Sequence, residues 1–115
     1  MKTVPTIHEL RKKGWKVRVG HHRKYFRYNR FSGRKEEKIL LRSEWQSLID
    51  QNDVWYLSAM GGVTVITITV PDYDKDFAGV SECSDEEHYR RSTGVKKALA
   101  RALSIFTVDQ RNTGN

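Results

Sequence analysis

The chain has 115 residues, the size of one ordinary domain, and its 21 lysines and arginines outnumber its 14 aspartates and glutamates by seven. One cysteine excludes an internal disulfide framework, and no apolar run approaches the roughly 18–20 residues of a membrane-spanning helix. The first ten residues also lack the apolar stretch of a signal peptide. We therefore expect a cytoplasmic protein with no membrane partner, folded as a single domain over residues 1–115.

The first third of the sequence predicts a short helix and a basic hairpin. Thr6 to Glu9 has the pattern of a capping box, which predicts a helix near 7–13. Apolar and basic residues then alternate over 15–19, as they do in a half-buried strand. Residues 25–31 are aromatic and basic, and we expect them to pair back on that strand through a turn at 20–22.

The middle of the chain predicts a second short helix and three strands. A second capping box at 43–46 opens a helix that ends near Gln51. Strands are expected over 54–60 and 63–70, the second of which alternates Ile and Val with Thr toward its end. A turn at 71–74 should return the chain as a partner strand over 77–83.

The longest predicted helix runs from 85 to 106. A third capping box at 84–87 precedes it, and an apolar stripe follows at helical spacing. Gly94 in its interior costs about 1 kcal/mol relative to alanine, so a close neighbour, either backbone or ligand, should compensate. The polar tail from about 107 is expected to fray.

These elements predict an α+β fold. An antiparallel sheet, built mainly from 15–31 and 54–83, should carry the long C-terminal helix on one face. One or two short helices complete this fold.

Positive charge is concentrated in residues 11–38, which hold twelve lysines and arginines and two acids. Aromatic residues are interleaved with these cations, and such a mixture can supply both phosphate contacts and stacking faces for bases. The alternative is an edge hairpin whose charges only deter aggregation. The candidate contacts with nucleic acid or another anion are Arg18, Arg23, Lys24, Tyr25, Arg27, Tyr28, Arg30, Arg34 and Lys35.

A second candidate site is the turn into the last helix, where Tyr89 and Arg91 flank the apolar stripe. Residues 83–103 have the pattern C-S-x-x-[acid]-x-[aromatic]-x-R-x-x-G-x-x-x-A-x-x-R-A-L. The pattern resembles the C-terminal signature of small bacteriophage-encoded proteins, among them the Thoeris anti-defence sponge proteins. Its matching residues are Cys83, Ser84, Glu87, Tyr89, Arg91, Gly94, Ala98, Arg101, Ala102 and Leu103.

This resemblance implies an oligomeric phage protein that acts in the cytoplasm of an infected bacterium. Such proteins sequester cyclic ADP-ribose-type signals of host defence without destroying them. Carried over to this chain, the ligand contacts are Arg91 and, less directly, Tyr89. The chain departs from the pattern after the glycine, where an arginine is usual and Val95 stands here.

Motifs for catalysis are absent from the sequence. It contains no H-E-x-x-H, Walker loop or G-x-S-x-G. His21 and His22 are adjacent, so in a strand their rings point to opposite faces and cannot chelate one metal ion. Cys83 with His88 could be a nucleophile and its base, but a strand-end cysteine more often packs as a small hydrophobe. We expect no enzyme activity, no metal and no cofactor.

The sequence thus favours a non-enzymatic protein that sequesters a phosphate-bearing nucleotide signal of host defence as a homo-oligomer. The first alternative is a nucleic-acid-binding protein, or an inhibitor of a host nucleic-acid enzyme, since the charge exceeds what a small ligand needs. The second alternative is a protein–protein inhibitor whose basic face docks on an acidic host factor.

Overall fold

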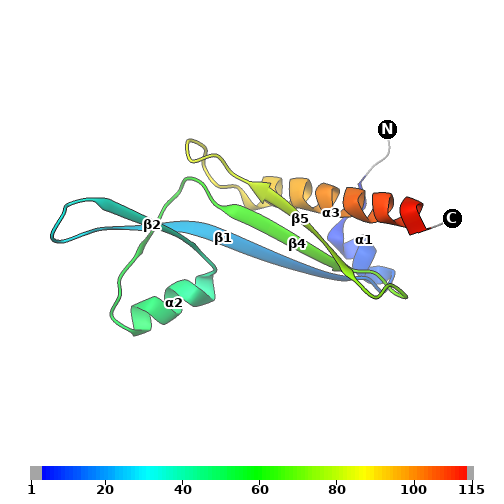
Figure 1. Cartoon of the computed structure of the whole chain (residues 1–115), viewed down its shortest axis with the longest axis horizontal. Helices are drawn as coiled ribbons and strands as arrows, with labels where there is room; N and C mark the ends of the chain where they lie inside the picture. Colours follow the sequence, from blue (N-terminus) through cyan, green and yellow to red (C-terminus); the bar gives the residue numbers. More distant parts are fainter. Residues whose placement is uncertain (1–3, 114–115) are drawn as a thin grey trace.

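The computed structural model describes residues 4–113 and has the predicted α+β fold, with an antiparallel sheet and a long C-terminal helix (Figure 1). The short helices precede and interrupt the sheet. The elements in chain order are α1 (Ile7–Lys12), β1 (Lys16–Tyr28), β2 (Lys35–Leu40), α2 (Arg42–Asp50), β3 (Tyr56–Leu57), β4 (Val63–Thr69), β5 (Asp76–Glu82) and α3 (Arg91–Thr113).

The sheet is organised around β1, whose 13 residues pair with three other strands. Its first half pairs antiparallel with β4, which in turn pairs with β5. Its second half pairs with β2, and residues 25 and 26 also pair with β3. The strand order is therefore β2-β1-β4-β5, with β3 joined to β1.

The predicted turn at residues 20–22 is wrong, because β1 continues through it. Gly20 lies outside the positive-φ region, and His21 and His22 stay in register with β4, opposite Thr64 and Val63. The chain turns instead at 29–34. There the Asn29 side-chain carbonyl accepts backbone N–H groups from residues 31 and 32, and Gly33 adopts a φ of 69°.

The strands predicted at 63–70 and 77–83 are confirmed as β4 and β5, and the two short helices are confirmed as α1 and α2. Thr6 caps α1 by accepting the Glu9 backbone N–H at 3.1 Å. The strand expected over 54–60 shortens to Tyr56–Leu57. The alternation in β4 identified the strand correctly because one of its faces is buried and the other is not.

The long helix begins six residues later than predicted. Residues 83–90 form a loop that pairs with 59–61: the N–H of Tyr89 donates to the Ala59 carbonyl, and the N–H of Gly61 to the Glu87 carbonyl. The Ser84 hydroxyl accepts the N–H of Glu86 within this loop and caps no long helix. The helix also extends to Thr113, so the tail predicted to fray from 107 is helical.

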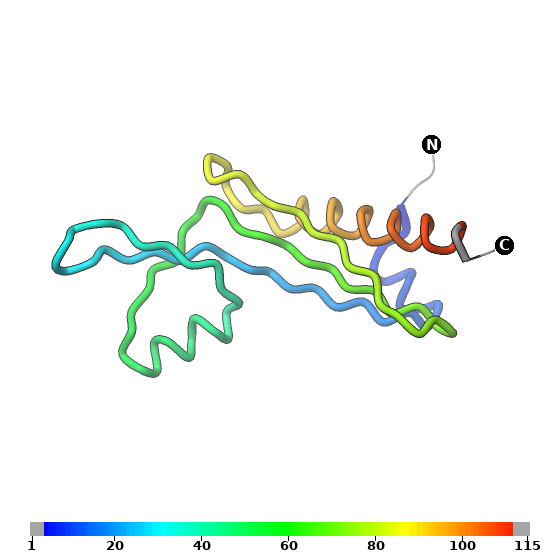
Figure 2. Tube along the Cα trace, viewed as in Figure 1, coloured from blue at the N-terminus to red at the C-terminus, as the bar shows by residue number. Residues whose placement is uncertain are grey.

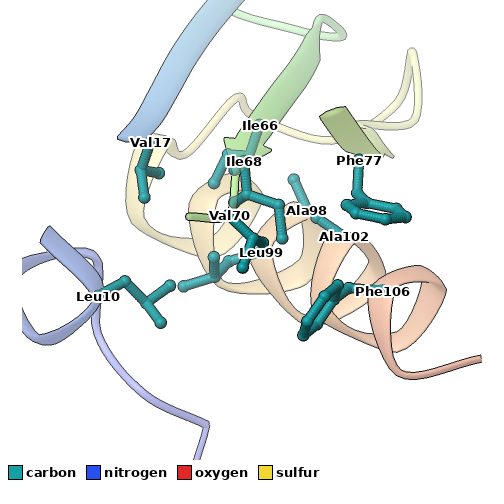
Figure 3. Packing of buried hydrophobic residues seen from close by; sticks show 10 residues of the cluster. All are labelled: Leu10, Val17, Ile66, Ile68, Val70, Phe77, Ala98, Leu99, Ala102 and Phe106. Atoms are coloured by element: carbon teal, nitrogen blue, oxygen red, sulfur yellow. The ribbon is translucent and has the colours of Figure 1, made fainter. Parts of the chain in front are cut away.

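The main core lies between α3 and the face of β1, β4 and β5 that the helix covers (Figure 3). Gly79 on β5 lets the helix backbone approach: a Cβ there would lie 2.0 Å from the Ala98 carbonyl oxygen. The residues of this core are Leu10, Val17, Ile66, Ile68, Val70, Phe77, Ala98, Leu99, Ala102 and Phe106.

Residues 23–57 form an extension that we call the arm, which projects from the main core (Figures 1 and 2). The radius of gyration is 17.6 Å, against about 13 Å for a compact chain of this length. Side chains on one face of the arm pack under α2: the Trp45 ring stacks on the buried Tyr25 at 5.4 Å, and its indole N–H donates to the Trp55 carbonyl. The arm therefore has packing contacts of its own, separate from the main core.

Candidate functional site

Tyr89 lies in the loop before α3 and joins that loop to the sheet. Its hydroxyl is 2.5 Å from Nδ1 of His21 on β1 and 2.7 Å from the Thr64 hydroxyl on β4. Its ring fills the space beside Gly62, where a Cβ would come within 2.7 Å of the ring. Two strands and a glycine thus fix the position of this side chain, which sequence reasoning placed on the helix itself.

Arg23 is held against the outer face of Tyr89. Its guanidinium carbon lies 4.4 Å from the centroid of the tyrosine ring, and one of its terminal nitrogens donates to the Ser58 carbonyl at 3.3 Å. Its Nε is buried and has no hydrogen-bond partner within the described chain. A buried donor without an acceptor is costly, so the position of Arg23 is an unfavourable feature of the folded chain.

A cavity of about 550 Å³ opens beside Arg23, between β1 and the first residues of α2 and α3; we call it the arginine cavity. Arg23, Arg42 and Arg91 line it, each from a different element. Tyr25 and Trp45 supply an aromatic wall. No aspartate or glutamate from residues 4–113 is among the lining residues, so these three positive charges are not neutralised within the cavity.

The start of α2 adds to the positive character of this cavity. Arg42 and Ser43 are the first two residues of this nine-residue helix, and both line the wall. The end of the helix dipole that carries partial positive charge therefore lies at the cavity, as it does at many phosphate sites. The arrangement favours a small anion with oxygen acceptors.

The pKa of His21 is affected by burial and by the positive charges of the same region. Burial lowers the pKa of His21 below its ordinary value of 6.5, and the charges of Arg91 and Arg23, then of His22, lower it further. The imidazole is therefore neutral at pH 7. A neutral ring protonated on Nε2 lets Tyr89 donate its hydroxyl hydrogen to Nδ1 and accept one from Thr64.

We predict that the stability of the protein falls as the pH drops below about 6.5. Below this pH the unfolded chain binds a proton at His21, whereas the folded chain does not, because its His21 pKa is lower. Proton binding to the unfolded chain favours unfolding. The loss of stability continues until the pH falls below the pKa of His21 in the folded protein. Urea unfolding between about pH 7.5 and pH 5 should show this loss. His21→Asn should reduce the slope with pH, and His88→Gln, at an exposed residue that does not contribute to the His21 shift, should preserve it; equal slopes in all three proteins would contradict the assignment.

A second cavity, of about 410 Å³, lies on the other side of Tyr89, between the end of β5 and the start of α3. Glu82, Glu86 and Glu87 line it together with Arg90 and Lys97, so its charge is mixed. The two residues that the phage-protein resemblance singles out therefore line different cavities. Arg91 lines the arginine cavity, and Tyr89 lines the second cavity.

Cys83 also borders the second cavity, where its thiol lies 3.4–3.6 Å from the backbone carbonyls of Ser84, Glu87 and His88. The contact with His88 is thus through its backbone and not through its imidazole. Within the described part of the chain, no three His, Cys, Asp or Glu side chains gather as a metal site. None of its helices is long and apolar enough to cross a membrane.

Four of the candidate basic residues form ion pairs, and the longest of these joins Lys35 to Glu37 at 3.9 Å. Lys24 contacts Asp85 at 2.5 Å and Glu37 at 2.8 Å, and these two hydrogen bonds raise the pKa of Lys24. Arg27 pairs with Glu36 at 3.2 Å and with Asp53. Arg18 pairs with Asp76 at 2.8 Å. These cations are partly neutralised by the protein itself, so they are weaker candidates for contacts with an anionic partner.

The other candidates lie apart from one another. Tyr25 is buried under α2, and Arg23 faces the arginine cavity. Arg30 and Arg34 are exposed in the turn at the tip of the arm, where no acidic residue of the described chain pairs with either. Tyr28 and Lys35 lie beside that turn on adjacent strands. The sequence cluster 11–38 is therefore not one continuous anion-binding surface.

Sequence reasoning missed Arg42, Trp45 and His21 as parts of a site. Arg42 is 19 residues from Arg23 and 49 from Arg91 along the chain, and only the fold of the arm brings the three together. The only local signal was the capping box that follows Arg42, which placed this residue at a helix start. No family model, no curated protein and no solved structure matches the chain.

Proposed function

We propose that the protein binds a phosphate-bearing nucleotide in the arginine cavity and retains it without changing it chemically. The observation that carries this proposal is the set of three arginines around a cavity with no acidic lining residue. Guanidinium groups match phosphate oxygens in geometry and charge. A volume of about 550 Å³ is also within the ordinary range for small-molecule sites.

The remaining lining residues suit the rest of a nucleotide. Trp45 offers aromatic and apolar surface for a base, and Ser43 offers a hydroxyl for a sugar or phosphate. The Nδ1 atom of His21 already bonds to the Tyr89 hydroxyl, so this imidazole is poorly placed to act as a general base.

We propose that the bound nucleotide is a signal of host defence and that the protein sequesters it. The support for this proposal is the resemblance of residues 83–103 to phage sponge proteins, together with the position of Arg91. This residue is a ligand contact by the resemblance and independently lines the arginine cavity. A sponge must hold its ligand intact, which agrees with a site rich in arginine and poor in general bases. Self-association, also implied by the resemblance, is part of the proposal.

Native mass spectrometry of the protein purified from bacterial cells tests the proposal. We expect an added mass corresponding to a nucleotide, which denaturation releases with its chemical identity unchanged, and the subunit count in the same spectrum. Titration with ADP-ribose and cyclic ADP-ribose, followed by calorimetry, should detect binding at the emptied site. A protein that carries no added mass and binds neither compound would refute the proposed function.

A further inference from the structure

The outer face of the arm carries three aromatic side chains, of which Tyr28 and Tyr56 are more than half exposed and Phe26 is partly buried. Successive side chains of β1 alternate between faces, so Phe26 and Tyr28 lie on the opposite face to Tyr25 and α2. Tyr56 on β3 pairs with Phe26 in register, and the centroids of these two rings are 5.9 Å apart. Tyr28 is 64% exposed and Tyr56 is 60% exposed. We call this surface the aromatic face.

Cations border these rings. Lys35, the cross-strand partner of Tyr28, has its ammonium nitrogen 5.1 Å from the centroid of the Phe26 ring. Glu37 is the one acidic residue in register on this face; Lys24 pairs with it at 2.8 Å, and Lys35 lies 3.9 Å from its other carboxylate oxygen. Of the other acids of the arm, Glu36 and Asp53 bind Arg27, Glu44 accepts the Leu41 backbone N–H, and Asp50 accepts from the Gln46 side chain.

The tip of the arm extends this combination of rings and charge. Phe31 is 99% exposed, and Arg30 and Arg34 stand on either side of it in the sequence. The turn that holds them is ordered by hydrogen bonds from the backbone of residues 31 and 32 to the Asn29 side chain. A fully exposed phenylalanine is unfavourable in water, so a defined turn that displays one between two unpaired arginines indicates a contact surface.

We propose that the aromatic face and the tip bind single-stranded DNA or RNA by base stacking. Every base has a π-face that can stack on Tyr or Phe, and the neighbouring Lys and Arg side chains can follow the phosphate backbone. The exposure of Tyr28 and Tyr56 leaves ring surface available to a ligand, and neither ring is stacked flat on Phe26, since the interplanar angles are 79° and 38°. Paired bases in a duplex do not offer these faces, so single strands fit better.

This inference is independent of the proposed nucleotide site. The two surfaces use opposite faces of β1, and none of the residues that line the arginine cavity belongs to the aromatic face or the tip. Arg91→Ala should therefore leave the binding of single strands unchanged.

Fluorescence anisotropy with a labelled oligothymidylate tests the inference. The wild-type protein should bind it more tightly than a duplex of equal length, with a salt dependence of about 0.7 per phosphate engaged. Tyr28→Ala should weaken binding about tenfold, and Tyr28→Phe, which keeps the ring, should not. Ile105→Ala, at a residue of α3 that is about half exposed, is the matched control.

Four results would overturn the inference. The first is an absence of binding at low salt, and the second is equal binding by wild type and Tyr28→Ala, which would leave only backbone attraction. The third is a Tyr28→Ala protein that sediments as a smaller species than wild type but binds the oligonucleotide equally well. Loss of a dimer in this variant would assign the aromatic face to self-association. Loss of binding in Arg91→Ala alone would place the oligonucleotide in the arginine cavity and overturn it equally.

Discussion

Replacement of Gly79 by alanine should lower the free energy of unfolding by about 3 kcal/mol or more. The added methyl would lie 2.0 Å from the Ala98 carbonyl oxygen and 2.5 Å from the Ala102 backbone nitrogen. Both atoms belong to the backbone of α3, so the clash can be relieved only by moving the helix away from β5. In a chain of this size we expect a decrease in melting temperature of about 10 °C.

Ala78 offers the matched control for this experiment. It is adjacent on β5, exposed, and faces away from α3, so Ala78→Val adds more volume than Gly79→Ala but meets no helix. Urea unfolding should show a change of less than about 0.5 kcal/mol for this variant. A Gly79→Ala protein with an unchanged urea midpoint would show that α3 does not contact β5 as closely as the structure has it.

Gly94 shows how far the sequence could predict such contacts. A glycine inside a helix predicted a close neighbour, and one is present: a Cβ at Gly94 would lie 2.3 Å from the Thr64 hydroxyl oxygen. The neighbour is a side chain of β4, however, and neither backbone nor ligand. That hydroxyl also binds Tyr89, so the glycine makes room for the contacts that fix the loop before α3. Local sequence indicated the need for space, but only the fold shows what fills it.

The main sheet and α3 were predictable because burial imposes a period on the sequence. Ile66 and Ile68 face the core and Thr67 lies between them on the other face, which is the pattern of a strand with one face buried. The helix start was not predictable from capping residues. The acidic residues at 85–87 suit a first helical turn, but pairing of the loop backbone with residues 59–61 competes with helix formation there.

The continuous β1 strand shows a second limit of local patterns. Gly20 followed by two histidines resembles a turn, yet His21 contributes to the core-facing side of the sheet and bonds to Tyr89. The stabilising contacts come from residues 43 and 68 positions further along the chain. Arg91 was accessible to sequence reasoning because it lies in the segment that resembles phage proteins, whereas Arg42 reaches the arginine cavity only through the fold of the arm.

Arg91→Ala should reduce nucleotide affinity about 10- to 150-fold, which corresponds to the roughly 1.5–3 kcal/mol of a hydrogen bond to a charged group. The melting temperature of the ligand-free protein should stay nearly unchanged. Arg91 is exposed at the first position of α3, and no acidic residue among 4–113 pairs with it. Its removal should also raise the pKa of His21 toward 6.5, because the charge of Arg91 helps to lower it.

Arg90→Ala is the matched control for Arg91→Ala. Arg90 is adjacent in sequence and equally exposed, but it lines the second cavity, where Glu86 and Glu87 offset its charge. Calorimetric titration with ADP-ribose and cyclic ADP-ribose should show near wild-type affinity for Arg90→Ala and weak binding for Arg91→Ala. An NMR titration of the His21 ring should show the raised pKa in Arg91→Ala alone. If Arg91→Ala unfolds the protein, Arg91 is a structural residue; if the His21 pKa rises but affinity is unchanged, the nucleotide is bound elsewhere than in the arginine cavity.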